Sequence, residues 1–133
     1  MRFTVPGEPK AKGRPRFSAK SGTVYTPKET TSWENKVGLY AFQAGARPVE
    51  GAVEVRAQFF YEWPKSKHRK REPRLAERMA GGRDDIDNLA KCLLDGLQGV
   101  AFHNDRQVAV LHAEKWRALQ GHPARTHVEV RAL

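Results

Sequence analysis

The segment AVEVRAQFFY, residues 52–61, decides the fold class. Apolar and polar side chains alternate along it, and one side consists of Val53, Val55, Ala57, Phe59 and Tyr61. A period of two places these apolar side chains on one face, as in a strand with one buried face. We therefore expect a β-sheet with other elements packed against one of its faces.

The spacing of apolar residues predicts two helices around this strand. One covers residues 27–44, with Thr26 as its cap and Pro27 in its first turn. The other covers about residues 87–98. Further strands are expected over residues 2–5, 107–116 and 126–133.

The order of these elements predicts one α+β domain over residues 1–133, with a mixed sheet of about four strands and two helices. The turn at Gly121-His122-Pro123 favours an antiparallel hairpin of the last two strands. The single cysteine, Cys92, fits a reducing compartment. The sequence contains no apolar run of about 18 residues, the length that a membrane-spanning helix needs. We expect a soluble cytoplasmic protein.

The formal net charge of +9 indicates a polyanionic partner, most often a nucleic acid. Residues 7–28 form a basic arm, either extended or a loose hairpin, and residues 63–83 form a basic loop. Between residues 84 and 110 five acidic residues outnumber two basic ones, which suits a divalent cation held against phosphate. The cations that we expect to contact DNA are Lys10, Lys12, Arg14, Arg16, Lys67, Arg69, Lys70 and Arg71.

Asp85 and Asp87 are the first candidate metal ligands. If Asp87 caps the second helix, the two carboxylates project from one face of an extended segment. Carboxylate oxygens suit Mg²⁺, with Mn²⁺ as a substitute, and no Cys/His cluster suits zinc. Asp105 is the expected third ligand if its turn folds back toward the sheet, and Lys91 contacts phosphate or pairs with Asp95.

Each of these residues also has an ordinary structural interpretation. Asp87 can be a helix cap, Asp85 and Asp105 turn residues, and the basic loop a solvated face. Only their combination with the charge pattern favours a functional site.

Together the motifs resemble the RusA family of Holliday junction resolvases, which is common in phages and prophages. The family pattern Asp-x-Asp-Asn-Leu with a following Lys is matched by residues 85–91, and Asp-Ala-Leu by Asp95-Gly96-Leu97. Asp-Asp-x-Gln-Val is matched by Asn104-Asp105-Arg106-Gln107-Val108. The segments Pro6–Pro9, Lys12–Phe17 and Val24–Pro27 are similar to the opening of many members.

The resemblance implies a RusA-like fold, metal binding by Asp85, Asp87 and Asp105, and a catalytic role for Lys91. It further implies Mg²⁺, a homodimer, paired symmetric nicks across a four-way junction, and a bacterial or phage origin. Asn104 and Gly96 depart from the pattern, and Asp84 stands where many members have Pro. Two alternatives stay open: a non-catalytic nucleic-acid-binding module, and a nuclease selective for flaps or forks.

Overall fold

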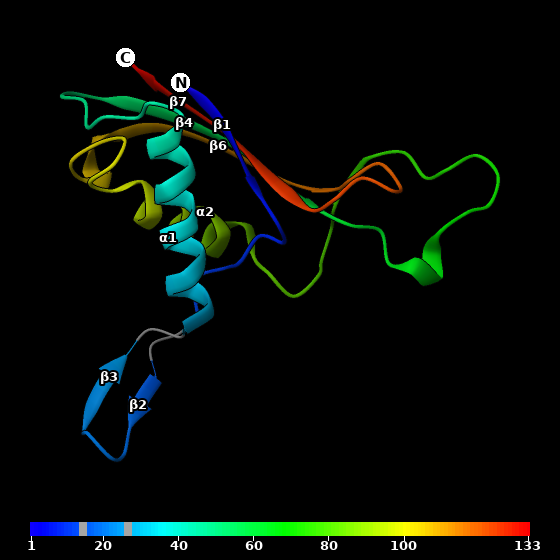
Figure 1. Cartoon of the computed structure of the whole chain (residues 1–133), viewed down its shortest axis with the longest axis horizontal. Helices are drawn as coiled ribbons and strands as arrows, with labels where there is room; N and C mark the ends of the chain where they lie inside the picture. Colours follow the sequence, from blue (N-terminus) through cyan, green and yellow to red (C-terminus); the bar gives the residue numbers. More distant parts are fainter. Residues whose placement is uncertain (14–15, 26–27) are drawn as a thin grey trace.

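A five-stranded mixed sheet and two helices on one of its faces form the body of the protein (Figure 1). The computed structural model describes residues 1–13, 16–25 and 28–133, with the backbone alone at residues 16, 17 and 25. The sheet has the order β1-β7-β4-β6-β5. Its strands are β1 (Arg2–Pro6), β4 (Val53–Tyr61), β5 (Glu77–Arg78), β6 (Val108–Arg117) and β7 (Arg125–Ala132).

The alternating strand predicted over residues 52–61 is β4, the centre of the sheet. Its inward side chains, Val53, Val55 and Phe59 among them, are fully buried. They pack against α1 (Lys28–Gln43) and α2 (Ile86–Leu97), which contribute Trp33, Val37, Leu89, Leu93 and Leu97 to the same core. The predicted α+β class and both helices are confirmed.

The basic arm contains a small hairpin, and the basic loop contains short elements of its own. Strands β2 (Arg16–Ser18) and β3 (Thr23–Tyr25) pair apart from the main sheet and extend away from the body (Figure 1). The loop includes a 3₁₀ turn at Lys65–Lys67 and the edge strand β5. The predicted helix start at Thr26 and Pro27 lies outside the described residues.

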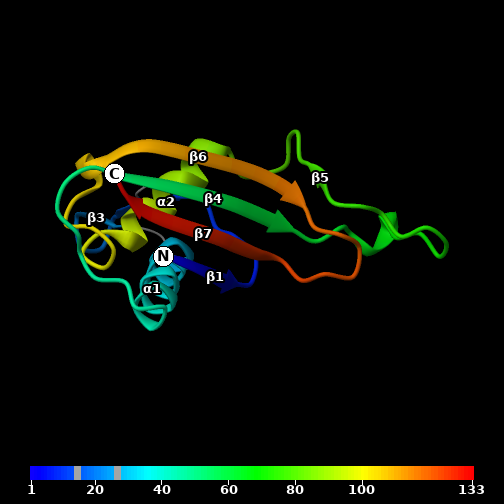
Figure 2. The same ribbon diagram turned by 90° about the horizontal axis from the view of Figure 1, so that it is seen from above.

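The predicted antiparallel hairpin of the last two strands is wrong. Strand β4 lies between them, parallel to β6 and antiparallel to β7 (Figure 2). The connection from Arg117 to Arg125 leaves seven residues, 118–124, outside both strands. That is longer than the two to five residues typical of a hairpin and long enough to pass over one strand.

Helices α1 and α2 touch most closely at Gly96. A Cβ atom added there would lie 2.8 Å from the Glu34 carbonyl oxygen and 2.9 Å from the Val37 Cβ atom. Backbone cannot move aside as a flexible side chain can. The glycine is therefore a packing requirement between the helices, although it weakens α2 as a helix.

We predict that Gly96→Ala destabilises the protein, even though alanine is the better helix former by about 1 kcal/mol. Overpacking should outweigh that gain and lower the free energy of unfolding in urea by about 1–2 kcal/mol. Gly38→Ala is the matched control, because its Cβ would meet the Gly96 carbonyl oxygen at a milder 3.2 Å. A Gly96→Ala protein more stable than wild type would contradict this packing.

Candidate active site and nucleic-acid interface

Asp85 and Asp87 lie at the N-terminus of α2. Asp85 is the N-cap residue, with an extended backbone (φ −80°, ψ 143°), but its side chain makes no capping hydrogen bond. Asp87 is in the first helical turn, not at the cap as the sequence predicted, because the helix begins at Ile86. Both side chains are exposed at the positive end of the helix dipole, and neither forms an ion pair with a described residue.

Asp84 holds the peptide that precedes Asp85 against the sheet. Its carboxylate accepts a 2.8 Å hydrogen bond from the Tyr61 hydroxyl of β4, and its carbonyl accepts one of 2.8 Å from Lys115 of β6. Burial and the Asp84 charge raise the pKa of Tyr61, so its hydroxyl stays protonated and donates. Asp84 is thus an anchor for the neighbouring carboxylates.

Sequence reasoning missed Tyr61 and Lys115. The available signal was Lys115 itself, since it lies on the same face of β6 as Ala113, which packs against the core beside the buried Ala57 in the parallel register. A cation on the covered face of a strand needs a specific acceptor.

Asp105 opens a 3₁₀ turn, Asp105–Gln107, immediately before β6. Asn104 is its N-cap residue and accepts a 2.9 Å hydrogen bond from the Arg106 amide. Gln107 secures the turn by donating to the carbonyls of Val49 and Gly51 at 2.7 and 2.9 Å. Asn104 therefore has a structural role where the family pattern has Asp, and the exposed Asp105 carboxylate projects from a well-fixed turn.

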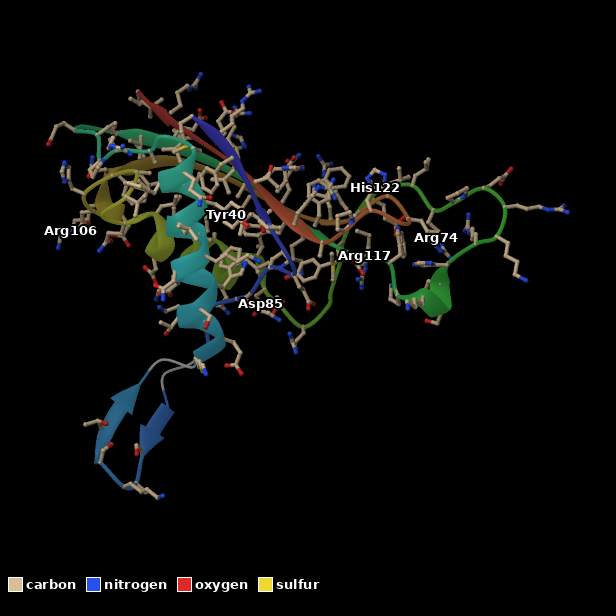
Figure 3. The ribbon with its side chains drawn as sticks, viewed as in Figure 1. Tyr40, Arg74, Asp85, Arg106, Arg117 and His122 are labelled. Atoms are coloured by element: carbon tan, nitrogen blue, oxygen red, sulfur yellow. The ribbon has the colours of Figure 1, made fainter. Side chains whose placement is uncertain are left out.

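Asp105 lies at the opposite end of α2 from Asp85. The Asp105 amide donates a 3.3 Å hydrogen bond to the side chain of Gln98, the C-cap residue of this helix. Twelve helical residues separate the two caps, which corresponds to about 18 Å. In Figure 3 the labelled Arg106, the neighbour of Asp105, lies far from the labelled Asp85.

One chain therefore does not bring the three aspartates together. Within the described ranges, no group of three His, Cys, Asp or Glu residues could hold a metal ion. The expectation that the Asp105 turn folds back to Asp85 is wrong for a single subunit. Strand β6 begins directly after that turn and runs parallel to β4, so the turn stays at the far end of α2.

Lys91 is exposed on α2, one turn beyond Asp87. Lys91 does not form the alternative ion pair with Asp95, whose carboxylate contacts Lys12 instead. The Lys91 ammonium forms no ion pair with any described residue. It remains available to a phosphate near the helix N-terminus.

Lys12 points into the fold, which differs from its expected contact with DNA. Its ammonium lies 2.8 Å from Glu34 of α1 and 2.9 Å from Asp95 of α2, and its side chain is 23% exposed. Burial by itself lowers the pKa of Lys12, but the hydrogen bonds to both carboxylates outweigh burial, and the net pKa is raised. Lys12 thus joins the two helices.

Two backbone amides of the arm, those of Lys12 and Gly13, hold this segment against the first turns of α1 and α2. The Lys12 amide donates to the Asn88 carbonyl at 3.0 Å, and the Gly13 amide donates to Thr30 Oγ1 at 2.9 Å. Beneath it, burial raises the pKa of the Cys92 thiol to about 12, so this cysteine is an inert core residue.

An open groove of about 680 Å³ runs between the arm and the start of α2. Asp85 and the strongly exposed Arg83 line it on one side, and Lys10 lines it on the other. Lys10 also lies 3.6 Å from Glu8. Of the other arm cations, Arg14 lies outside the described residues, and only the backbone of Arg16 is described.

The basic loop presents the remaining expected cations at the surface. Lys67, Arg69, Lys70 and Arg71 are all exposed, on a segment that extends beyond the end of the sheet (Figure 1). Arg83, which was not among the expected DNA contacts, adds a cation next to the carboxylates. No helix in the described part of the chain has the length and apolar character to cross a membrane.

Comparison with known proteins agrees with the motifs at this site. The family described as Endodeoxyribonuclease RusA matches residues 6–131 of the 133. The protein YqaN of Bacillus subtilis (strain 168), described as uncharacterized, is 32% identical over 125 residues, which cover 87% of each chain. The family match spans the arm, the basic loop and the positions of all four expected catalytic residues.

We predict that Lys12→Gln lowers the free energy of unfolding by about 1–3 kcal/mol, because it leaves two carboxylates without their cation. Since the folded-state pKa of Lys12 lies above its ordinary 10.5, this stabilisation is complete below pH 10.5. It is lost as pH rises through the folded-state pKa. Urea unfolding of both proteins from pH 7 to 11 measures the difference.

The control for this prediction is Lys20→Gln in the exposed turn of the β2–β3 hairpin. That change should shift stability by less than about 0.5 kcal/mol. Equal stabilities of the Lys12→Gln and wild-type proteins at pH 7 would show that the half-buried pairs of Lys12 with Glu34 and Asp95 contribute nothing.

Proposed function

The chain belongs to the RusA family of Holliday junction-resolving endodeoxyribonucleases, and from this premise we propose a Mg²⁺-dependent homodimer that cuts four-way junctions by paired symmetric nicks. Mn²⁺ substitutes for Mg²⁺ in this proposal. The enzyme acts in DNA recombination and repair, in the cytoplasm of a bacterium or as a phage product. The observation that carries the proposal is the pair of exposed carboxylates, Asp85 and Asp87, at the start of α2, where Asp85 makes no capping hydrogen bond and lines a groove together with Lys10 and Arg83.

The donor chemistry of Asp85 and Asp87 fits a hard divalent cation, since both offer oxygen atoms and neither forms an ion pair with a cation among the described side chains. When bound, Mg²⁺ neutralises charge on the scissile phosphate and activates the attacking water. The protein orients the ligands through Asp84, whose bonds to Tyr61 and Lys115 fix the start of α2. Lys91 adds a positive charge near the phosphate.

A second subunit supplies the third carboxylate in this proposal. A two-fold axis that sets two α2 helices antiparallel places the N-terminus of one beside the C-terminus of the other. Asp85 and Asp87 would then share a site with Asp105 of the partner subunit. Two such sites arise in one dimer, one for each of two opposed DNA strands.

Strand β6 provides a surface for this pairing. Apart from β5, which reaches only Trp116 and Arg117, no described strand covers its outer edge. Val110 and Leu111 on this strand are 37% and 44% exposed. An unpaired strand edge with exposed apolar side chains is a template for a second copy, and α2 packs against the same strand.

The cations divide the binding work between two regions. Arg83 and Lys10 line the groove at Asp85, whereas Lys67, Arg69, Lys70 and Arg71 bind the backbone of a junction arm farther out. Contacts of this kind depend on phosphate charge, so affinity falls steeply with salt. Branch shape, not base sequence, then supplies most of the selectivity.

Cleavage assays on a four-way junction, a fork and a duplex, each with and without Mg²⁺, test the proposed function. We expect paired nicks in the junction alone, only with the metal ion, and cleavage reduced at least about 1,000-fold by Asp85→Asn, since a lost metal ligand removes transition-state stabilisation. Junction binding by Asp85→Asn should persist. Faster cutting of forks would favour the flap or fork nuclease, and binding without any cutting would favour the binding module.

Mixing two inactive variants tests the shared site. In a heterodimer of Asp85→Asn and Asp105→Asn chains, one site carries both changes, while the other keeps Asp85, Asp87 and the partner subunit's Asp105. We therefore expect the mixture to regain single-strand nicking that neither variant shows alone. If every site belonged to one chain, both sites of the heterodimer would be damaged and the mixture would stay inactive.

A further inference from the structure

We propose that Gln120 is a positioning residue for DNA binding: its side-chain amide closes the tip of the basic loop and holds the loop cations in place. The inference rests on the proposed DNA-binding role of this loop. Gln120 lies in the connection between β6 and β7, about fifty residues beyond the loop in sequence. Nothing in its local sequence marks it as part of a binding surface.

One amide group binds both sides of the loop tip. Gln120 Oε1 accepts hydrogen bonds from the Arg69 amide at 3.0 Å and from the Arg74 amide at 3.1 Å. Gln120 Nε2 donates to the Arg69 carbonyl at 2.9 Å, and the Gln120 backbone amide donates to the Arg74 carbonyl at 2.9 Å. Residues 69 and 74 are therefore fixed to the same side chain, and residues 70–73 form a closed tip between them.

This tip would not stay closed readily without hydrogen bonds across it. Residues 63–75 contain six basic residues and one acidic residue, and their mutual repulsion favours an open segment. Glu72 has a φ of 52°, in a region that residues other than glycine adopt rarely. A strained turn of this kind persists only where surrounding contacts determine it, and the Gln120 amide supplies those contacts directly across it.

Other contacts close the base of the loop but do not reach its tip. The Trp63 indole donates to the Leu75 carbonyl at 3.3 Å, and the Arg74 guanidinium lies over its ring at 4.9 Å. Arg117 lies on the same ring at 6.0 Å, and Figure 3 shows Arg74 and Arg117 at this end of the molecule. The Arg74 guanidinium also donates to the Lys67 carbonyl at 2.5 Å, so loss of the Gln120 side chain should loosen residues 69–73 while Arg74 and the base of the loop stay in place.

Preorganisation of the tip should strengthen binding, because a loop already ordered loses less conformational entropy when it meets DNA. We expect Gln120→Ala to weaken junction binding about 5- to 20-fold. Its cleavage rate at saturating junction should stay within about twofold of wild type, because Asp84, Asp85 and their anchors are untouched. This separation of affinity from rate distinguishes positioning from catalysis.

The experiment measures junction affinity by fluorescence anisotropy and, in parallel, hydrogen exchange of the Arg69 and Arg74 amides. Gln120→Ala should accelerate exchange at both amides at least about tenfold, since their acceptor is removed. Gln43→Ala, at the exposed end of α1, removes an amide that makes no contact with the loop and should change neither quantity. Circular dichroism melting confirms that each variant is folded.

A double change, Lys70→Gln with Arg71→Gln, gives the opposite pattern and keeps the test decisive. It removes two tip cations but leaves the hydrogen bonds of the Gln120 side chain intact, so amide exchange at Arg69 and Arg74 should stay slow. In the proposed dimer this change removes two tip cations from each subunit, so the slope of log affinity against log salt should fall by about 4, whereas Gln120→Ala should keep the wild-type slope.

Unchanged exchange in Gln120→Ala, or faster exchange with unchanged affinity, would overturn the role of Gln120. Wild-type protein that fails to bind junction DNA would instead overturn the proposed function. In that case the exchange measurement still decides whether Gln120 orders the loop.

Discussion

Asp85 and Asp105 are held at the two ends of one twelve-residue helix, and the organisation of the site follows from that separation. A helix of this length cannot bend to bring its ends together, so in the proposed enzyme one subunit offers two half-sites and no complete one. In the proposed dimer this separation makes activity depend on dimerisation, because a free subunit lacks a full set of ligands. In this proposal cleavage depends on assembly of the dimer, which suits the proposed cutting of two strands of one junction.

The rest of the fold keeps that helix in a defined position. Gly96 lets α1 and α2 approach closely, and Lys12 joins them through Glu34 and Asp95. At the N-terminus of α2, Tyr61 and Lys115 fix Asp84, so the exposed carboxylates beside it are presented by rigid neighbours. At the other end, Gln107 fixes the turn that carries Asp105. The candidate ligand carboxylates, which carry like charges, are thus held by contacts outside the candidate site.

Local patterns in the sequence predict the elements well and their assembly less well. The alternation around Val55 and the leucine spacing of α2 locate a strand and a helix, because side-chain periodicity is a local property. The separation of β6 from β7 by β4 depends on burial across the whole sheet. The motif around Asp85 identifies the family but not the distance to Asp105. Long side chains were the least predictable: Lys12 points inward, and Gln120 reaches a loop far away in sequence.

The central claim is that a metal ion joins carboxylates of two subunits, and anomalous diffraction from crystals grown with Mn²⁺ tests it most directly. The account predicts a dimer with an anomalous peak at each of two equivalent positions. Each peak should lie within coordination distance of Asp85 and Asp87 of one subunit and Asp105 of the partner subunit. A peak held by a single chain, or manganese bound elsewhere while these aspartates stay far apart, would contradict the account.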